Sequence, residues 1–294
     1  AETVATEVVG TVDMVEGANT GTGLLTGVVV SASDGSFNYA DFSLAQLDRF
    51  AVLSEQALSS GVVGVVLPAT PEDCPNGGSV TVSGTIDDAT GTTLSPGDSL
   101  SLVFNDCNIE GTLFTGGFDL TIEAISPDFL LQTPPEAFEL TFKLVINDLS
   151  VTEAGETFSS NGDMTLALSD DGAGNIASTM SGTSLTATVA GETETLSNYT
   201  YVLTENSLAH YTIDITGTLD STILGGSVDF ITEVVFEGDG EDNPTVGTLH
   251  IYSTFDASQA RVIALDETNV RIDVDTDGDD GYVQTFTTWA ELEL

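Results

Sequence analysis

Apolar and polar residues alternate along much of this chain. In the run 138–146 every even-numbered position is Phe, Leu or Ile, and Glu, Thr and Lys occupy three of the odd-numbered positions. The same period recurs at 80–86, 118–122, 211–219, 228–236 and 249–255. Successive side chains of a β-strand point to opposite faces, so each run predicts a strand with one buried and one solvated face. Such strands belong to antiparallel sheets, because parallel sheets are covered on both faces.

Turn-forming residues separate the alternating runs. They are Asp34-Gly35, Asn76-Gly77-Gly78, Pro96-Gly97, Asp171-Gly172 and Gly238-Asp239-Gly240. Gly, Asn and Asp tolerate the positive φ that hairpin turns require. From residue 138 onward the pattern is almost entirely strand, turn and strand, so we predict an all-β fold. The expected architecture is a long-stranded antiparallel meander that forms a sandwich, a curved sheet or a partial barrel.

One segment departs from this period. Between Asp41 and Ser60 the apolar residues fall three and four positions apart, which is the spacing of a helix face. Asp41 or Ser43 could cap the first turn. We expect one helix near residues 41–60, packed on a sheet face or closing the end of a barrel. The alternative is a helix that binds a partner or a membrane surface, and the scarcity of Lys and Arg disfavours the membrane.

Prolines interrupt the chain once, at Pro127 and Pro134-Pro135. The segment 126–136 is therefore either a seam between domains or a long crossover. The composition does not change across it, so we expect residues 1–294 to form a single large β domain.

The chain is strongly acidic. It carries 47 Asp and Glu against 4 Lys and Arg, a formal net charge of −43, yet 40% of its residues are hydrophobic. A disordered acidic segment lacks such apolar content, so this chain can bury a core. Four scattered cations are too few to bind nucleic acid, and no apolar run is long enough for membrane insertion. Salt or divalent cations relieve the self-repulsion of the carboxylates, which favours a saline or Ca²⁺-containing extracellular medium.

Two cysteines, Cys74 and Cys107, flank a Gly-, Ser- and Thr-rich pair of expected strands. The simplest interpretation is one disulfide formed outside the cytosol, and the alternatives are two buried thiols or a metal site with two sulfurs. The chain begins at Ala1 rather than Met, so we expect a processed, mature protein that is secreted, extracellular or on a cell surface.

The strongest motif is acidic and lies near the C-terminal end. Carboxylates recur at alternate positions in Asp273, Asp275, Asp277 and Asp279. With Gly278 at a sharp turn, this spacing suits a hard, oxygen-seeking cation and predicts a Ca²⁺-binding β-turn. The motif is not an EF-hand, because the twelfth position is Gln284 and the flanking segments are expected strands. An acidic hairpin turn without an ion is the alternative, and Asp87–Asp98 and Glu237–Asp242 are weaker candidates for the same role.

The sequence contains no convincing catalytic motif. His210 and His250 fall on the polar sides of their strands, where two His and a carboxylate could hold Zn²⁺. Isolated surface histidines are the favoured interpretation. The nucleophile elbow, the zinc-protease helix and the phosphate-binding glycine loop are missing from the sequence. A pair of glycosidase carboxylates would be invisible without geometry, and we expect a protein that is not an enzyme.

The N-terminal segment predicts a further strand. Its alternating apolar residues are Val4, Val8, Val12 and Met14. Such a strand pairs by default with its own sheet, but it could instead pair with the exposed sheet edge of another copy. Repeated head to tail, the second arrangement builds a filament in which the partner is the protein itself. We therefore favour a self-assembling extracellular structural protein. The alternatives are a monomeric surface or periplasmic binding module for an apolar ligand, and a Ca²⁺-dependent adhesin.

Several segments together resemble a known class of proteins. They are Cys74-Pro-Asn-Gly-Gly-Ser-Val, Leu94-Ser-Pro-Gly-Asp-Ser-Leu, Phe104-Asn-Asp-Cys107, Val270-Arg-Ile-Asp-Val-Asp-Thr-Asp-Gly278 and Thr287-Thr-Trp289. In these stretches the chain resembles secreted or lipoprotein-type β-rich surface proteins of Gram-negative bacteria. The resemblance implies a cell-surface location, a Cys74–Cys107 bridge and Ca²⁺ at the Asp273 loop, and it implies no catalytic residues. The start at Ala1, in place of a lipidated Cys, departs from the lipoprotein variant.

Overall fold

The computed structural model describes residues 29–30, 37–38, 65–86, 93–109, 111–128, 135–153, 155–189, 191–240 and 242–292. The predicted N-terminal strand of Val4, Val8, Val12 and Met14 and the predicted helix at 41–60 lie outside these residues. The described part contains one short helix, α3 (Trp289–Leu292). No helix within it is both long and apolar enough to cross a membrane.

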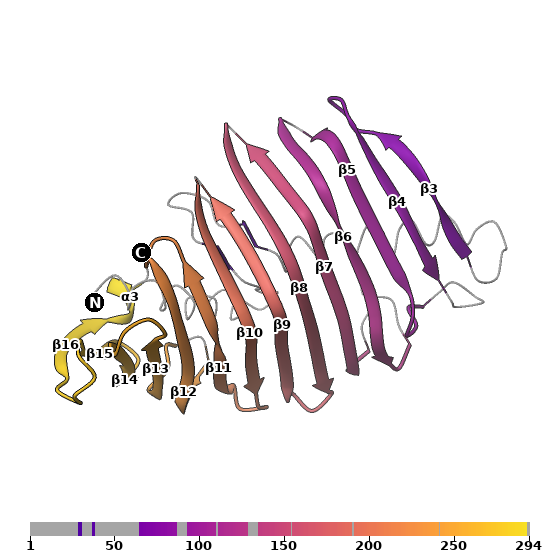
Figure 1. Ribbon diagram of the computed structural model, residues 1–294. Helices are drawn as coiled ribbons and strands as arrows, with labels where there is room; N and C mark the ends of the chain where they lie inside the picture. The colour runs from indigo at the N-terminus through magenta and orange to yellow at the C-terminus, as the bar shows by residue number, and fades with distance from the viewer. Residues whose placement is uncertain are drawn as a thin grey trace. The chain divides into compact units, whose positions relative to one another are not determined.

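The described strands account for most of the described residues (Figure 1). They are β1 (Val29–Val30), β2 (Phe37–Asn38), β3 (Val65–Asp73), β4 (Ser79–Ile86), β5 (Ser99–Ile109), β6 (Thr112–Ser126), β7 (Ala137–Glu153), β8 (Glu156–Asp171), β9 (Ile176–Val189), β10 (Glu192–Glu205), β11 (His210–Ser221), β12 (Gly226–Asp239), β13 (Val246–Ser253), β14 (Gln259–Ala264), β15 (Asn269–Asp275) and β16 (Val283–Thr288).

The sheet order follows the chain order. β1 and β2 pair with each other, and β3 to β16 form one 14-stranded sheet in which each strand lies beside its neighbours in sequence. The register is antiparallel in every pair from β3 to β8 and from β10 to β16. This confirms the predicted all-β antiparallel meander, in the form of a single sheet that does not close on itself.

The described residues group into two compact units. Unit 2 contains β3 to β8 and the second part of β9, whereas unit 1 contains the first part of β9 and the chain from Glu194 onward. The prolines at 126–136 fall between β6 and β7, which belong to the same unit and pair with each other from Leu113 to Ser126. The single-domain expectation stays a prediction.

The core of unit 2 consists of cross-strand rows of buried residues. Leu100, Leu120, Leu144 and Met164 are successive partners on β5, β6, β7 and β8, and all four are buried. Full burial of one such side chain stabilises the fold by about 1.5–3 kcal/mol. The alternation seen in the sequence therefore corresponds to one buried face of the sheet.

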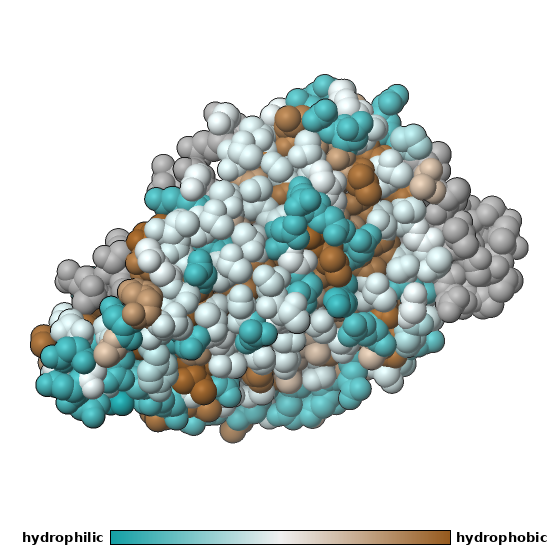
Figure 2. Space-filling model, in the orientation of Figure 1, coloured by the Kyte–Doolittle hydropathy of each residue, from teal (hydrophilic) through white to brown (hydrophobic). Residues whose placement is uncertain are grey.

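Unit 1 is built in the same way. Leu249, Val262 and Ile272 are opposite one another on β13, β14 and β15, and all three are buried. The intervening residues on these strands lie on the other face, which is mainly polar. Figure 2 shows one face of the molecule, where white and teal residues dominate and brown apolar residues form separate groups.

Unit 2 also contains the predicted disulfide. Cys74 directly follows β3 and is bonded to Cys107 on β5, with 5.4 Å between their Cα atoms. The chain turns back between Cys74 and Gly78. The N–H of Cys74 donates a hydrogen bond of 3.1 Å to the carbonyl oxygen of Gly78. The disulfide confirms the first of the three interpretations of the cysteine pair.

Candidate metal centre and sheet edge

The acidic motif forms the connection between β15 and β16. Asp275 is the last residue of β15, and residues 276–282 lead to Val283 at the start of β16. Gly278 has φ +74°, and a Cβ atom at this position would lie 2.8 Å from the carbonyl oxygen of Ala257. Glycine is therefore required at this point, where the chain turns tightly against a neighbouring loop.

Asp275 anchors this turn. Its side chain is 1% exposed. Oδ1 accepts hydrogen bonds from the backbone N–H groups of Asp277 (3.2 Å) and Gly278 (2.9 Å), and Oδ2 accepts from the N–H of Asp280 (2.9 Å). Oδ2 also accepts from the Gln259 side-chain amide on β14 at 3.0 Å. The Gln259 bond, together with the three backbone bonds, holds the pKa of Asp275 well below its usual range.

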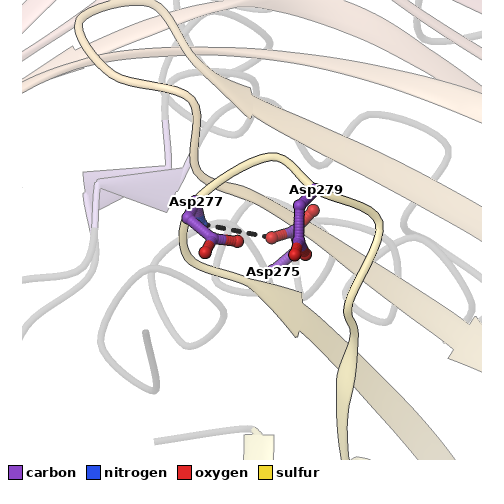
Figure 3. A group of neighbouring side chains, drawn as sticks. All are labelled: Asp275, Asp277 and Asp279. Atoms are coloured by element: carbon purple, nitrogen blue, oxygen red, sulfur yellow. Dashed lines mark hydrogen bonds between the residues drawn. The ribbon is translucent and has the colours of Figure 1, made fainter.

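Three carboxylates meet in this turn. Ligand oxygens of Asp275, Asp277 and Asp279 lie within 4.8 Å of one another, and Figure 3 shows the three side chains gathered on the same loop. The negative charge of Asp279 raises the pKa of Asp277, because two carboxylates at close range disfavour double ionisation. Asp277 and Asp279 are exposed.

This triad could hold a metal ion. Every donor in it is an oxygen, which suits hard divalent cations rather than thiolate-seeking ones. Four N–H groups already occupy the approximately four acceptor positions of the Asp275 carboxylate. Asp277 and Asp279 therefore have the more available oxygens, and coordination by Asp275 would replace one of its hydrogen bonds.

Asp273, the fourth residue of the predicted set, lies outside the triad. It sits on β15 and is buried, and its Oδ2 accepts a hydrogen bond of 3.1 Å from Nη2 of Arg271. Oδ1 of Asp273 is 2.9 Å from Nε of Arg271. The N–H bond does not point at this oxygen, so the second contact is an ion pair rather than a hydrogen bond.

The surroundings of the triad include a buried histidine. His250 on β13 is 3% exposed, so the prediction of an isolated surface histidine is wrong for this residue. Its Nδ1 lies 2.7 Å from Oε1 of Glu233 and its Nε2 lies 2.9 Å from Oε1 of Gln259. The reason is register: β12 and β14 bring these two side chains against the ring, and single-strand alternation does not report on neighbouring strands.

His210 is far less buried than His250. It lies at the start of β11, opposite Asp239 on β12, and its Nδ1 is 2.9 Å from Oδ1 of Asp239. Its Nε2 is 3.8 Å from a carboxylate oxygen of Glu237. Each ring nitrogen of His210 thus faces a different carboxylate at the end of β12.

The Asp87–Asp98 candidate is described only at its C-terminal end. Residues 87–92 lie outside the described part of the chain. Asp98 is buried and its Oδ2 accepts a hydrogen bond of 2.8 Å from the backbone N–H of Ser95. At this end the acidic side chain therefore closes its own turn.

Two strands end the sheet order, β3 and β16, and among the described strands each has a single hydrogen-bonded neighbour. β3 contains Pro68 and Pro71, which lack the N–H group that a further strand would need. β16 has neither Pro nor Lys. Its Val283 and Phe286 side chains are 69% and 68% exposed. Within the described residues, β16 is therefore an edge strand that lacks Pro and Lys and carries two exposed apolar side chains.

The disulfide indicates a non-cytoplasmic environment, because thiols in the cytosol are kept reduced. The disulfide, the carboxylate turn and the β16 edge are the three features on which a functional interpretation can rest. Comparison of the chain with protein-family models, with curated protein sequences and with solved structures gives no match.

Proposed function

We propose that this protein is a secreted or cell-surface structural protein whose copies associate by β-strand addition. The observation that carries the proposal is the exposed edge strand β16, with its apolar Val283 and Phe286. A strand added beside β16 gains backbone hydrogen bonds and covers both side chains. Repeated from copy to copy in one direction, this contact produces an open filament.

The donor in this proposal is the N-terminal segment of a second copy. Val4, Val8, Val12 and Met14 all stand at even positions, so an extended segment presents them on one face. This segment lies outside the described residues, so its assignment as the donor strand rests on its sequence. A structural role, rather than a catalytic one, agrees with the lack of a catalytic motif in the sequence.

The charges beside β16 affect contact between two acidic chains. Arg261 on β14 and Arg271 on β15 are two of the four Lys and Arg residues of the whole chain. They face Glu233 and Asp273 at 3.6 Å and 2.9 Å respectively. These two ion pairs offset part of the negative charge on β12 to β15, whereas the turn that leads into β16 carries Asp275, Asp277, Asp279 and Asp280. Contact at this edge therefore depends on salt or cations that screen these carboxylates.

Two variants test the proposal. One lacks residues 1–15, and the other keeps the full length but has Ser in place of Val4, Val8, Val12 and Met14. Sedimentation velocity in moderate salt compares both variants with the intact chain. We expect the intact chain to polymerise and both variants to remain monomeric with the same far-ultraviolet β signal. Polymerisation of the truncated chain contradicts the proposal, because the donor strand is then missing.

A Ca²⁺-dependent surface adhesin is a second candidate, and the carboxylate triad is the observation that favours it. Ca²⁺ takes six to eight oxygen ligands and accepts waters among them. Asp277 and Asp279 would contribute the most available oxygens, and the ion would relieve their mutual repulsion. The turn would then be more rigid in Ca²⁺ than in chelator.

Calorimetry tests the metal component. The Asp277→Asn/Asp279→Asn variant leaves the Asp275 anchor in place. The Asp239→Asn/Asp242→Asn variant removes the same charge from the end of β12 and the turn that follows it. We expect heat of Ca²⁺ binding from the intact chain and from the second variant, and none from the first. Equal heats from both variants would assign the signal to non-specific screening of the acidic surface.

A further inference from the structure

A continuous chain of hydrogen-bonded side chains crosses the polar face of unit 1. It runs from Glu233 on β12 to His250 on β13 (2.7 Å), then to Gln259 on β14 (2.9 Å) and to Asp275 at the end of β15 (3.0 Å). His250 and Asp275 are both buried. The chain connects a titratable ring to the carboxylate that anchors the β15–β16 turn.

The orientation of each group follows from its partner. An ionised carboxylate only accepts hydrogen bonds, so the Gln259 atom that faces Asp275 must be the amide nitrogen. The carbonyl oxygen of Gln259 then faces Nε2 of His250, which must carry a hydrogen. On the other side of the ring, Oε1 of Glu233 is an acceptor for Nδ1. Both ring nitrogens are donors only in the imidazolium form, so this arrangement holds two protons on the His250–Glu233 pair.

We propose that His250 and Gln259 act as a proton-controlled relay that determines whether Gln259 donates a hydrogen bond to Asp275. When the pair loses one proton, the ring keeps a single N–H. The bond to the Glu233 carboxylate is charge-assisted and the stronger of the two, so the hydrogen stays on Nδ1. Nε2 then becomes an acceptor and faces the carbonyl oxygen of Gln259. The amide turns over to donate to the ring, and Asp275 loses its bond from β14.

The charged groups around the ring come from three strands. Glu233 lies against it from β12, and the ring centroid of Tyr252 on β13 is 3.8 Å away. Arg261 is directly opposite His250 on β14, and its Nε is 3.6 Å from the second oxygen of Glu233. Asp273 on β15 is opposite Arg261, so it adds a negative charge one strand further from the ring. Arg261 thus helps to keep the Glu233 carboxylate in place when the ring is neutral.

The consequence is a turn whose anchoring depends on pH. In acid, four N–H groups hold Asp275, and at higher pH only the three backbone groups remain. The relay needs neither a bound cation nor association between copies, so it is independent of the proposed function. Because the turn leads directly into β16, its geometry changes at the start of the edge strand.

Nuclear magnetic resonance in EDTA tests the relay. The chain has two histidines, so a His210→Asn background leaves His250 as the only imidazole to follow in a pH series. We expect both ring nitrogens to be protonated in acid and Nδ1 alone to be protonated at high pH. The side-chain NH₂ signal of Gln259 and the backbone amides of Gly278 and Asp280 should shift with the same midpoint as the ring.

A Gln259→Leu variant separates the relay from a simple effect of charge. It should leave the ring titration in place and abolish the linked shifts of the Gly278 and Asp280 amides. The relay is wrong if these amides still follow the ring in that variant. It is equally wrong if the high-pH tautomer carries its hydrogen on Nε2. The tautomer decides the matter even where the Gln259 variant does not fold.

Discussion

Removing the apolar side chains of β16 should weaken self-association without changing the fold. Val283→Thr/Phe286→Thr keeps residues with high β propensity and leaves the charge unchanged. Full burial of such side chains contributes about 1.5–3 kcal/mol each. Val283 and Phe286 are 69% and 68% exposed, so an added strand gains about 1–2 kcal/mol from each. The pair therefore accounts for about 2–4 kcal/mol, which corresponds to a roughly 30- to 900-fold change in the association constant.

Sedimentation equilibrium over a concentration series measures this change. Phe286 is opposite Arg271, and Val283 is opposite Val274, so the two side chains lie on different faces of the edge. The single variants should therefore have separate, additive effects. Leu208→Thr is the matched control, because Leu208 is 84% exposed but lies in the turn between β10 and β11. An unchanged association constant in the double variant, or an equal loss in the Leu208 variant, would refute the assignment of β16 as the contact.

Three further predictions concern stability, and denaturant titration measures all of them. Replacing Cys74 and Cys107 by Ser opens a 33-residue loop. In the chain-entropy model this should lower the free energy of unfolding by about 3.7 kcal/mol. An unchanged denaturation midpoint would contradict this prediction. The pKa of Asp275 is lower in the folded than in the unfolded protein, so ionised Asp275 stabilises the fold above about pH 4 and this stabilisation is lost in more acidic solution. Asp275→Asn in chelator should therefore be destabilising at neutral pH, with a difference that shrinks on acidification. Gly116→Ala should cost about 2–4 kcal/mol, because φ is +79° and the new Cβ would lie 2.0 Å from a carbonyl oxygen on β7. Gly111→Ala, with φ +96° and open space, should cost only the backbone strain of about 1–2 kcal/mol.

The strands of this protein are predictable from sequence because burial on one face imposes a period of two. The alternation at 138–146 lies within β7, and those at 211–219 and 228–236 lie within β11 and β12. The turn residues mark most connections for the same local reason, since the conformation that they favour depends on a few neighbouring residues.

The bulges are what the alternation does not predict. The register shifts between Phe104 and Cys107 and between Ile146 and Leu149. At each shift an Asp adopts positive φ, Asp106 in β5 and Asp148 in β7. Asp106 is close to Gly78 and Asp148 is close to Gly116. These pairings depend on which strand lies beside which, and a single alternating run carries no information about its neighbour.

The candidate site was predictable to the extent that it is local. Asp275, Asp277 and Asp279 meet because they share one turn, and their spacing in the sequence shows this. Asp273 belongs to the strand instead, and its partner Arg271 is two residues away on the same face. The contacts of Gln259 and His250 arise from the register of β12 to β15, so the sequence provides no signal for them.

The meander order has a consequence for how the chain folds. Each strand pairs with its neighbours in sequence, so every pairing closes a short loop and costs little chain entropy. The sheet can therefore grow by one strand at a time from any hairpin, and distant parts of the chain need not find each other first. During this growth the last strand added always presents an open edge. In the described sheet β16 has a single neighbour, so it keeps an open edge of the kind that serves as a template during this growth.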